Sequence, residues 1–362
     1  MRILDRYVLK EMVMPMLFGI CAFTSLFIGT DLLRVVTIAM DLGAPFNMVG
    51  KLFLFQLPQM IVYTFPMAVL LAVLLSLSRL SANSELVAMQ AGGIGFIRIM
   101  APVLVIGLVM SSLTLLINET VVPAANVAYK VTFAEMRGQT LPRTTRNVIL
   151  KRYKSNFLEW FLYAARFDSE LQTMEDVAIV TLDKSRPKET TYAPRVVWDD
   201  DGWFMENGIT HFHDEAGETV TMRFAGGRQP VDIGQKPRDI IASQKDPDEM
   251  NIKELSKHME ILRSQGKEVA RLEVDWHLKW AIPMASLVFA IVGAPLGIQS
   301  HRSASSVGFG LSIIVIFIYY LIMTAGSALA QGGYLPPAAG AWIQNVVMVV
   351  IGLSLIYKTA RK

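Results

Sequence analysis

The sequence carries little charge for its length. Charged residues make up 18% of the 362 residues, whereas a soluble domain usually has about a quarter. A single cysteine, Cys21, excludes an internal disulfide framework. The formal net charge is only +3 and no run of Lys and Arg stands out, so the composition does not indicate a nucleic-acid partner. Apolar residues make up 52% of the chain, and hydropathy is therefore the property to examine first.

Sequence motifs of common enzymes are also missing. The chain has no phosphate-binding G-x-x-x-x-G-K-[ST] pattern, no H-E-x-x-H and no G-x-S-x-G. His211 and His213 alternate on a predicted strand, but two histidines without further ligands nearby do not make a zinc site. We therefore predict that the chain is not an enzyme, with no catalytic residue and no bound metal or cofactor.

Six long apolar segments are what the sequence does contain. In hydrocarbon only a helix satisfies its own backbone groups, and roughly 20 residues are enough to cross a bilayer. The first segment is longer than the core of a secretory signal, so we expect it to be retained as a span. No charge lies in the middle of any span, which argues against an ion-coupled transporter. The predicted spans are Met12–Thr30, Leu52–Leu77, Ile97–Ile117, Trp280–Ile298, Val307–Leu329 and Ala341–Tyr357.

The distribution of Lys and Arg between the short loops predicts the orientation of the spans. One side has only Arg34 and Lys51. The other side has Arg2, Arg6, Lys10, Arg79, Arg98, Arg302, Lys358, Arg361 and Lys362. Because the more basic side faces the cytoplasm, we expect both termini to be cytoplasmic in a bacterial inner membrane, with the long segment after the third span in the periplasm.

That long segment has the composition of a β-domain. Short alternating stretches separated by turn residues predict strands at Phe157–Phe167, Ala178–Leu182, Arg195–Trp198, Gly202–Ile209 and Thr219–Phe224. After them, Ile252–Gln265 has one apolar face and is followed by Gly266, which predicts an amphipathic helix. The predicted fold is an α-helical polytopic membrane protein with six transmembrane helices and an inserted periplasmic β-jellyroll-like domain. We expect helices in 1–118, the β-domain in 119–250, a connecting helix in 251–275 and the remaining helices in 276–362.

The cytoplasmic loop between the second and third spans contains a predicted short helix, near residues 83–92. Asn83 or Ser84 can cap it, Glu85 suits its N-terminal end, and Gly92 with Gly93 can end it. One interpretation is an interfacial helix that lies on lipid headgroups. The other is a coupling helix that contacts a cytoplasmic partner, which an acidic residue favours because the inner leaflet is itself anionic. The candidate contact residues are Glu85, Leu86, Val87, Met89 and Gln90.

Several short motifs, in their order along this layout, resemble a known family. They are Leu4-Asp5-Arg6-Tyr7, Phe65-Pro66-Met67-Ala68, Ser84-Glu85-Leu86-Val87, Met89-Gln90-Ala91, Trp203, His277-x-Lys279, Pro283, Pro295-Leu296-Gly297, Tyr319-Tyr320, Pro336-Pro337 and Trp342. Together they cover nearly the whole chain, which resembles the lipopolysaccharide-export permeases, the paired Lpt permeases F and G of Gram-negative envelopes. The first motifs are closer to the G type and Pro295-Leu296-Gly297 is closer to the F type, so both types stay open.

The resemblance implies a set of partners. It implies a second permease subunit, either a paralogue or a second copy of this chain, and a lipid cavity enclosed by the pair. It also implies a separate cytoplasmic ABC ATPase that uses ATP and Mg and meets the coupling helix at Glu85. Periplasmic jellyroll proteins of the LptC and LptA type would receive the lipopolysaccharide.

Two groups of residues are candidates for lipid contact. Arg34 suits a phosphate on a lipid headgroup because its planar fork makes two hydrogen bonds, although an ion pair with Asp31 is an equal alternative. Lys130, by its place in the family pattern, and Lys51, which is more typical of a membrane anchor, are further headgroup candidates. A path for acyl chains, or alternatively ordinary helix packing, is predicted for Phe23, Phe27, Ile313, Ile316, Phe317 and Tyr320.

The sequence as a whole favours an export permease that extracts lipopolysaccharide and passes it to a periplasmic β-jellyroll bridge. Because the chain has no phosphate-binding loop, ATP hydrolysis must come from another polypeptide. The alternative is a membrane-anchored periplasmic scaffold without transport activity. A scaffold would need neither a coupling helix nor a lipid cavity.

Overall fold

The computed structural model of the chain describes residues 3–137, 144–154, 157–168, 171–183, 186–199, 202–213, 219–224, 227–234, 236–237, 240, 245–264, 266–299 and 305–361. The chain divides into two compact units. A helical unit contains residues 1–139, 247–252 and 270–362, and a β unit contains residues 140–246 and 253–269. Each unit has its own core.

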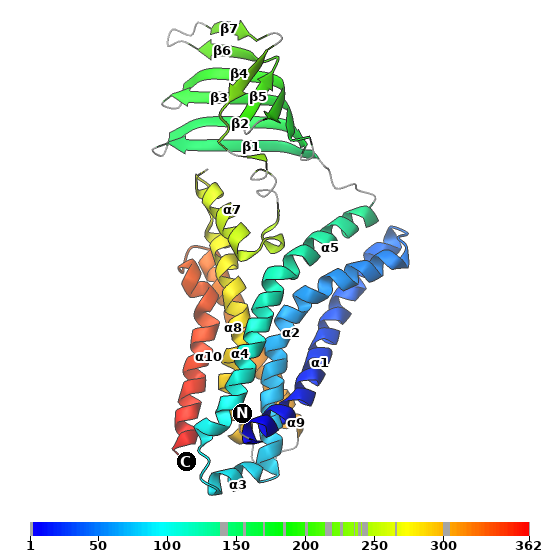
Figure 1. The fold of residues 1–362 in the computed structure, drawn as a ribbon, viewed down its shortest axis with the longest axis vertical. Coiled ribbons are helices and arrows are strands. Elements are labelled where there is room, and N and C mark those ends of the chain that lie inside the picture. The colour runs from blue at the N-terminus through cyan, green and yellow to red at the C-terminus, as the bar shows by residue number, and fades with distance from the viewer. Residues whose placement is uncertain are drawn as a thin grey trace. The chain divides into compact units, whose positions relative to one another are not determined.

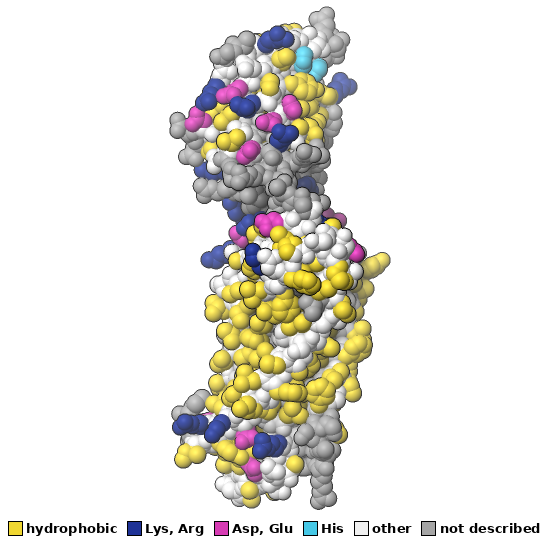
Figure 2. Space-filling view, turned by 90° about the vertical axis from the view of Figure 1, so that its right-hand side faces the viewer, with side chains coloured by type: hydrophobic (Ala, Val, Ile, Leu, Met, Phe, Trp, Pro, Cys, Tyr) yellow, Lys and Arg dark blue, Asp and Glu magenta, His cyan; other side chains and the backbone are white. Residues whose placement is uncertain are grey.

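Six helices of the helical unit are long and apolar enough to cross a membrane, which confirms the six predicted spans. Hydrophobic side chains cover most of the visible face of this unit and charged ones gather at its ends (Figure 2). Both ends of the chain lie at the same end of the unit as the short helix α3 (Figure 1). The spanning helices are α1 (Ile3–Asp41), α2 (Phe46–Ala82), α4 (Phe96–Thr120), α8 (Ala270–Gln299), α9 (Ser305–Gln331) and α10 (Pro337–Ala360).

Helices α2 and α8 form the centre of the helical unit. In each of them 78% of the apolar stretch is buried, against 17% for α1. Glycines allow the close approach of neighbouring helices: a Cβ added to Gly340 of α10 would lie 2.5 Å from the backbone oxygen of Gly326 in α9. Small residues at such contacts are how helices associate in a membrane, where burial of apolar surface alone gives little driving force.

Two proline residues inside the spans leave backbone carbonyls that side chains of neighbouring helices bind. Pro283 of α8 has no N–H for the carbonyl of Lys279, and Asn118 Nδ2 of α4 donates to that oxygen at 3.4 Å. Pro15 of α1 leaves the carbonyl of Glu11 in the same way, and Ser76 Oγ of α2 donates to it at 3.0 Å. The prolines therefore tie neighbouring helices together instead of leaving unpaired groups in hydrocarbon.

The boundary between the third span and the β-domain differs from the prediction. After α4 the chain continues as helix α5 (Val122–Met136), which packs against α2, and the first strand begins only at Thr144. The expected β-domain range of 119–250 therefore starts too early. Pro123 lies at the start of α5, a position where a proline costs no hydrogen bond, so it does not stop the helix.

The β unit is one antiparallel sheet of eight strands in its described residues. Strand β4 pairs with β3 along one edge, and its other edge is shared by β5 and β6, so the sheet forks at β4. Strand β7 extends one branch and β8 the other. The strands are β1 (Thr144–Lys154), β2 (Phe157–Asp168), β3 (Thr173–Asp183), β4 (Arg186–Asp199), β5 (Gly202–Glu206), β6 (Ile209–His213), β7 (Thr219–Arg223) and β8 (Arg228–Val231).

The sheet curls over its own core. Strands β2 and β5 are separated by two strands, a spacing of roughly 14 Å in a flat sheet. The rings of Phe167 in β2 and Trp203 in β5 nevertheless lie 6.4 Å apart, and Trp203 also contacts Trp198 at 5.2 Å. The inward-facing residues of β1 to β5 therefore share one apolar core, against which Val231 of β8 packs, and this confirms the predicted inserted β-domain.

Helix α7 (Ile252–Ser264) follows the strands and matches the predicted amphipathic helix except at its last residue, because Gln265 lies outside the described residues. Leu255, Met259 and His258 are buried. Gly266 adopts φ +65°, and the Lys267 N–H donates to the Leu262 carbonyl, so the helix ends as the sequence predicted. The connecting range of 251–275 is thus two helices, with α8 starting at Ala270.

Candidate lipid pocket and coupling helix

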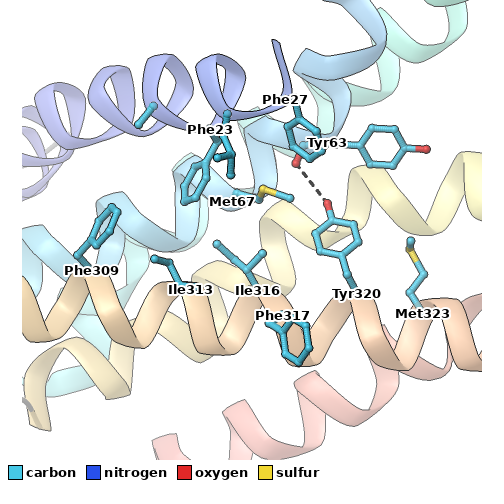
Figure 3. Close-up of a pocket in the computed structure, with 12 residues that line it drawn as sticks. Phe23, Phe27, Tyr63, Met67, Phe309, Ile313, Ile316, Phe317, Tyr320 and Met323 are labelled. Carbon is cyan, nitrogen blue, oxygen red and sulfur yellow. Dashed lines mark hydrogen bonds between the residues drawn. The ribbon is translucent and has the colours of Figure 1, made fainter. Parts of the chain in front are cut away.

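An apolar pocket of about 710 Å³ lies in the helical unit between α1 and α9. Its floor is α2, against which both other helices pack, while α1 and α9 barely touch each other. In Figure 3, Phe23 and Phe27 of α1 face Ile313 and Ile316 of α9 across Met67 of α2. The pocket is thus open along the side of the helical unit, where a membrane would present hydrocarbon.

All six residues predicted to line an acyl-chain path line this pocket, namely Phe23, Phe27, Ile313, Ile316, Phe317 and Tyr320. The other six lining residues were not predicted from the sequence. They are Ala22, Leu26, Tyr63, Met67, Phe309 and Met323. Those on α1 and α9 share the helical spacing of the predicted residues and could have been found by it. Nothing in the sequence indicates which face of α2 closes the pocket.

The polar atoms at the pocket are bound to the protein. Tyr320 Oη donates to the backbone oxygen of Tyr63 at 3.3 Å, a bond drawn in Figure 3. Behind it, Tyr319 Oη donates to Asn345 Oδ1 at 2.9 Å, and Asn345 Nδ2 donates to the Ala281 oxygen at 2.9 Å. These bonds fix α9 to α8 and α10 and leave an apolar surface toward the pocket.

The three predicted headgroup cations have different surroundings. Arg34 and Lys51 are exposed, and within the part of the chain that the structure describes Arg34 forms no salt bridge. The ion pair with Asp31, the alternative for Arg34, does not form among the described residues, and the Asp31 carboxylate accepts a hydrogen bond from Gln56 Nε2 at 2.8 Å. Lys130 instead pairs at 2.9 Å with Glu249, whose side chain is 8% exposed. The ammonium of Lys130 thus ties α5 to the 3₁₀ turn Pro247–Glu249, and its role at a lipid headgroup stays a prediction.

The short helix predicted near residues 83–92 exists as α3 (Glu85–Ala91). Its end matches the prediction: Gly93 adopts φ +84°, and the Ile94 N–H donates to the Met89 carbonyl. Its start does not. Ser84 has a left-handed backbone with φ +59° and makes no capping hydrogen bond, and Asn83 Nδ2 donates instead to Glu85 Oε1 at 3.3 Å.

The five candidate contact residues of α3 point in different directions. Leu86 is buried at 2% exposure in the core formed by α1, α2, α4 and α8, and Met89 packs at its border. Val87 is 55% exposed and Gln90 is also exposed. Leu86 is therefore buried in the helical core, whereas Val87 and Gln90 are accessible at the surface, and a contact of α3 with a partner stays a prediction.

The histidines of the β unit have ordinary strand environments. His211 Nδ1 and Thr221 Oγ1 lie 2.9 Å apart, and His213 Nε2 and Thr190 Oγ1 lie 3.2 Å apart. Among the described residues no group of three or more His, Cys, Asp and Glu side chains could hold a metal ion.

Six spanning helices, a lateral apolar pocket and an inserted β-domain define the chain as a polytopic membrane protein of the permease class. The family described as lipopolysaccharide export system permease LptF/LptG matches residues 6–358, and the chain belongs to this family. It is 24% identical to the lipopolysaccharide export system permease protein LptG of Escherichia coli strain K12, over 98% of both chains. It is 22% identical to LptF of the same strain, over 98% of this chain and 94% of the relative. LptG of Haemophilus influenzae is 23% identical over 82% of this chain and 81% of its own length.

Proposed function

We propose that this chain is the transmembrane permease subunit of an ATP-driven exporter that takes lipopolysaccharide from the inner membrane. The observation that carries the proposal is the open apolar pocket between α1 and α9. Its volume of about 710 Å³ lies within the roughly 300–1,000 Å³ of small-molecule sites. An acyl chain can enter it from the bilayer at little cost, because it exchanges one hydrocarbon environment for another.

Energetics support a separate ATPase. Each methylene moved from an apolar environment to water costs about 0.8 kcal/mol, so a chain of about a dozen costs roughly 10 kcal/mol. The sequence has no phosphate-binding loop to supply this energy. We propose that a cytoplasmic ABC ATPase supplies it, using ATP and Mg, and that it contacts Glu85, Val87 and Gln90 of α3.

Exposed surfaces of both units support further partners. Beside the pocket, Leu26 of α1 and Phe317 of α9 are 67% and 66% exposed, and a second permease subunit placed against them would enclose the lipid. Among the described residues of the β unit, strand β7 pairs with β6 alone. Its free edge can accept a strand of a periplasmic jellyroll protein, which would receive the lipid.

The proposed orientation places both termini in the cytoplasm. Arg79, Arg98, Lys358 and Arg361 support it through the preference of basic residues for the cytoplasmic side. The predicted orientation also uses three residues that lie outside the described residues, Arg2, Arg302 and Lys362. Arg34 and Lys51 would then lie at the periplasmic side, where a lipid headgroup phosphate can bind them.

Photo-crosslinking in cells tests the lipid part of the proposal. A photoreactive benzoylphenylalanine in place of Phe317 should crosslink to lipopolysaccharide, because the side chain lies at the mouth of the pocket. The matched control is the same group in place of Val350 of α10, which is 59% exposed but does not line the pocket. Equal crosslinking at both positions would show that the pocket holds no more lipopolysaccharide than the general surface.

A further inference from the structure

The hydroxyl of Tyr7 in α1 holds the carboxylate of Glu85 in α3. Tyr7 Oη donates to Glu85 Oε2 at 2.7 Å, while Asn83 Nδ2 lies 3.3 Å from the other oxygen. Both carboxylate oxygens of Glu85 therefore accept a hydrogen bond, although the side chain is only partly buried. Tyr7 belongs to the Leu4-Asp5-Arg6-Tyr7 motif, to which the proposed function assigns no part.

Two ion pairs join the same segment of α1 to the helices on either side of α3. Arg98 Nη2 of α4 lies 2.7 and 2.8 Å from the two carboxylate oxygens of Asp5, whose side chain is 13% exposed. Arg79 Nη1 of α2 lies 3.3 Å from Glu11. The Asp5 pair is the stronger of the two, because it is shorter and better shielded from water.

Apolar packing joins the same elements. Val8 and Met12 of α1 are fully buried, and they belong to the cluster that contains Leu86 of α3. The first turns of α1 are therefore joined to α3 directly by the Tyr7–Glu85 hydrogen bond, and both elements also pack into one apolar cluster with α2, α4 and α8. A displacement of α3 breaks this hydrogen bond unless α1 moves with it.

Helix α1 continues from this segment to the pocket. Phe23 and Phe27 lie on the same helix as Tyr7, and α1 supplies one whole wall of the pocket. Pro15 lies between the two parts, where the missing N–H weakens the helix, and Ser76 of α2 binds the freed carbonyl of Glu11. The opposite wall, α9, is tied to α8 and α10 through Tyr319 and Asn345.

We propose that the amino-terminal segment of α1 transmits movements of α3 to the pocket wall, with Tyr7 as the residue that positions Glu85 and Asp5 as the anchor on Arg98. The proposal rests on the proposed function, because only an α3 in contact with an ATPase has a movement to transmit. It assigns the moving wall of the pocket to α1 and the fixed wall to α9.

The test uses the complex purified from membranes with its associated subunits, in wild type, Tyr7→Phe and the control Tyr334→Phe, whose side chain is 81% exposed. Spin labels at Ala22→Cys and Phe309→Cys, in a Cys21→Ser background, report the distance between the two pocket walls with and without a nucleotide analogue. Stimulation of ATP hydrolysis by lipopolysaccharide is measured on the same samples. The amount of co-purified ATPase is recorded for each variant.

Tyr7→Phe should keep the ATPase subunit but lose most of the nucleotide-dependent distance change, with stimulation by lipopolysaccharide about fivefold to tenfold lower. Asp5→Arg and Arg98→Asp should each do the same, and the double exchange should restore coupling, which a general loss of folding would not allow. If Tyr7→Phe keeps the full distance change with its ATPase bound, the inference is overturned and the exporter stands. If no ATPase accompanies the wild type, the proposed function itself fails.

Discussion

At the scale of single residues, two cations at the same end of the helical unit differ in what they can bind. Arg34 is exposed and forms no salt bridge among the described residues, while Lys130 is paired with the nearly buried Glu249. Burial raises the pKa of Tyr129 in α5, and the Arg34 charge acts against this effect, which indicates that Arg34 lies near α5. Arg34 is thus an exposed cation near α5, whereas Lys130 is engaged in an ion pair.

We predict opposite effects for the two substitutions. Arg34→Ala should lower lipopolysaccharide crosslinking at position 317 several-fold and leave the thermal unfolding midpoint unchanged. Lys130→Ala should cost about 2 kcal/mol of stability, because it removes a charged hydrogen bond from a buried acid, and should leave crosslinking of the folded protein intact. Loss of crosslinking in Lys130→Ala at unchanged stability would contradict this assignment.

His258 gives the β unit a predicted sensitivity to acid. The residue is buried in α7, its Nδ1 has no hydrogen-bond partner among the described residues, and burial, aided by the Lys267 charge, lowers its pKa from 6.5. Below the unfolded pKa the unfolded state binds more protons than the folded state. The stabilising effect of neutral His258 is therefore complete above about pH 6.5 and is lost as the pH falls through the lowered folded pKa.

Thermal unfolding of the full chain measured between about pH 7.5 and 5 should show this loss. His258→Gln should reduce the pH dependence, since the glutamine carries no titrating group, and the exposed His213→Gln serves as its control. Equal pH dependence in wild type and His258→Gln would rule out His258 as the source.

At the scale of elements, helix α3 buries Leu86 and exposes Val87, and substitutions at these two positions should differ in their effect on stability. Leu86→Ala should cost about 2–5 kcal/mol, because it opens a cavity in a buried cluster. Val87→Asp should change stability by no more than about 0.5 kcal/mol, because the side chain is exposed, but should reduce the amount of ATPase that co-purifies. A Val87→Asp protein that retains its full complement of ATPase would place the partner elsewhere.

The elements also show what could be predicted from the sequence and what could not. The spans were predictable because hydrocarbon demands long apolar helices, and β2, β3, β5 and β7 alternate clearly. Helix α5 was missed because it is too polar for a span and has only a weak apolar face. The burial of Leu86 depends on how α1, α2, α4 and α8 pack, and the floor of the pocket depends on how α2 packs against α1 and α9. Hydropathy encodes neither arrangement. The pocket residues on α1 and α9 are predictable because large aliphatic and aromatic side chains recur on these two spans at helical spacing.

At the scale of the whole molecule, the proposed export of a lipid requires energy from outside the chain. An apolar pocket that accepts acyl chains from the bilayer would not by itself drive them into water. A contact between α3 and an ATPase, with α1 as the connecting element, would join the energy source to the pocket. The scaffold alternative needs none of these features.

Co-purification from detergent followed by a lipopolysaccharide-stimulated ATPase assay tests the central claim most directly. The comparison is between wild type, Glu85→Arg and the control Asp41→Arg. The control makes the same charge change at an exposed position, the last residue of α1, at the end of that helix away from Tyr7. The account predicts that an ATPase subunit accompanies wild type and Asp41→Arg and responds to lipopolysaccharide, and that Glu85→Arg loses the subunit or its response. If no ATPase accompanies any of the three proteins, the chain is not the permease of an ATP-driven exporter, and a membrane-anchored scaffold becomes the better account.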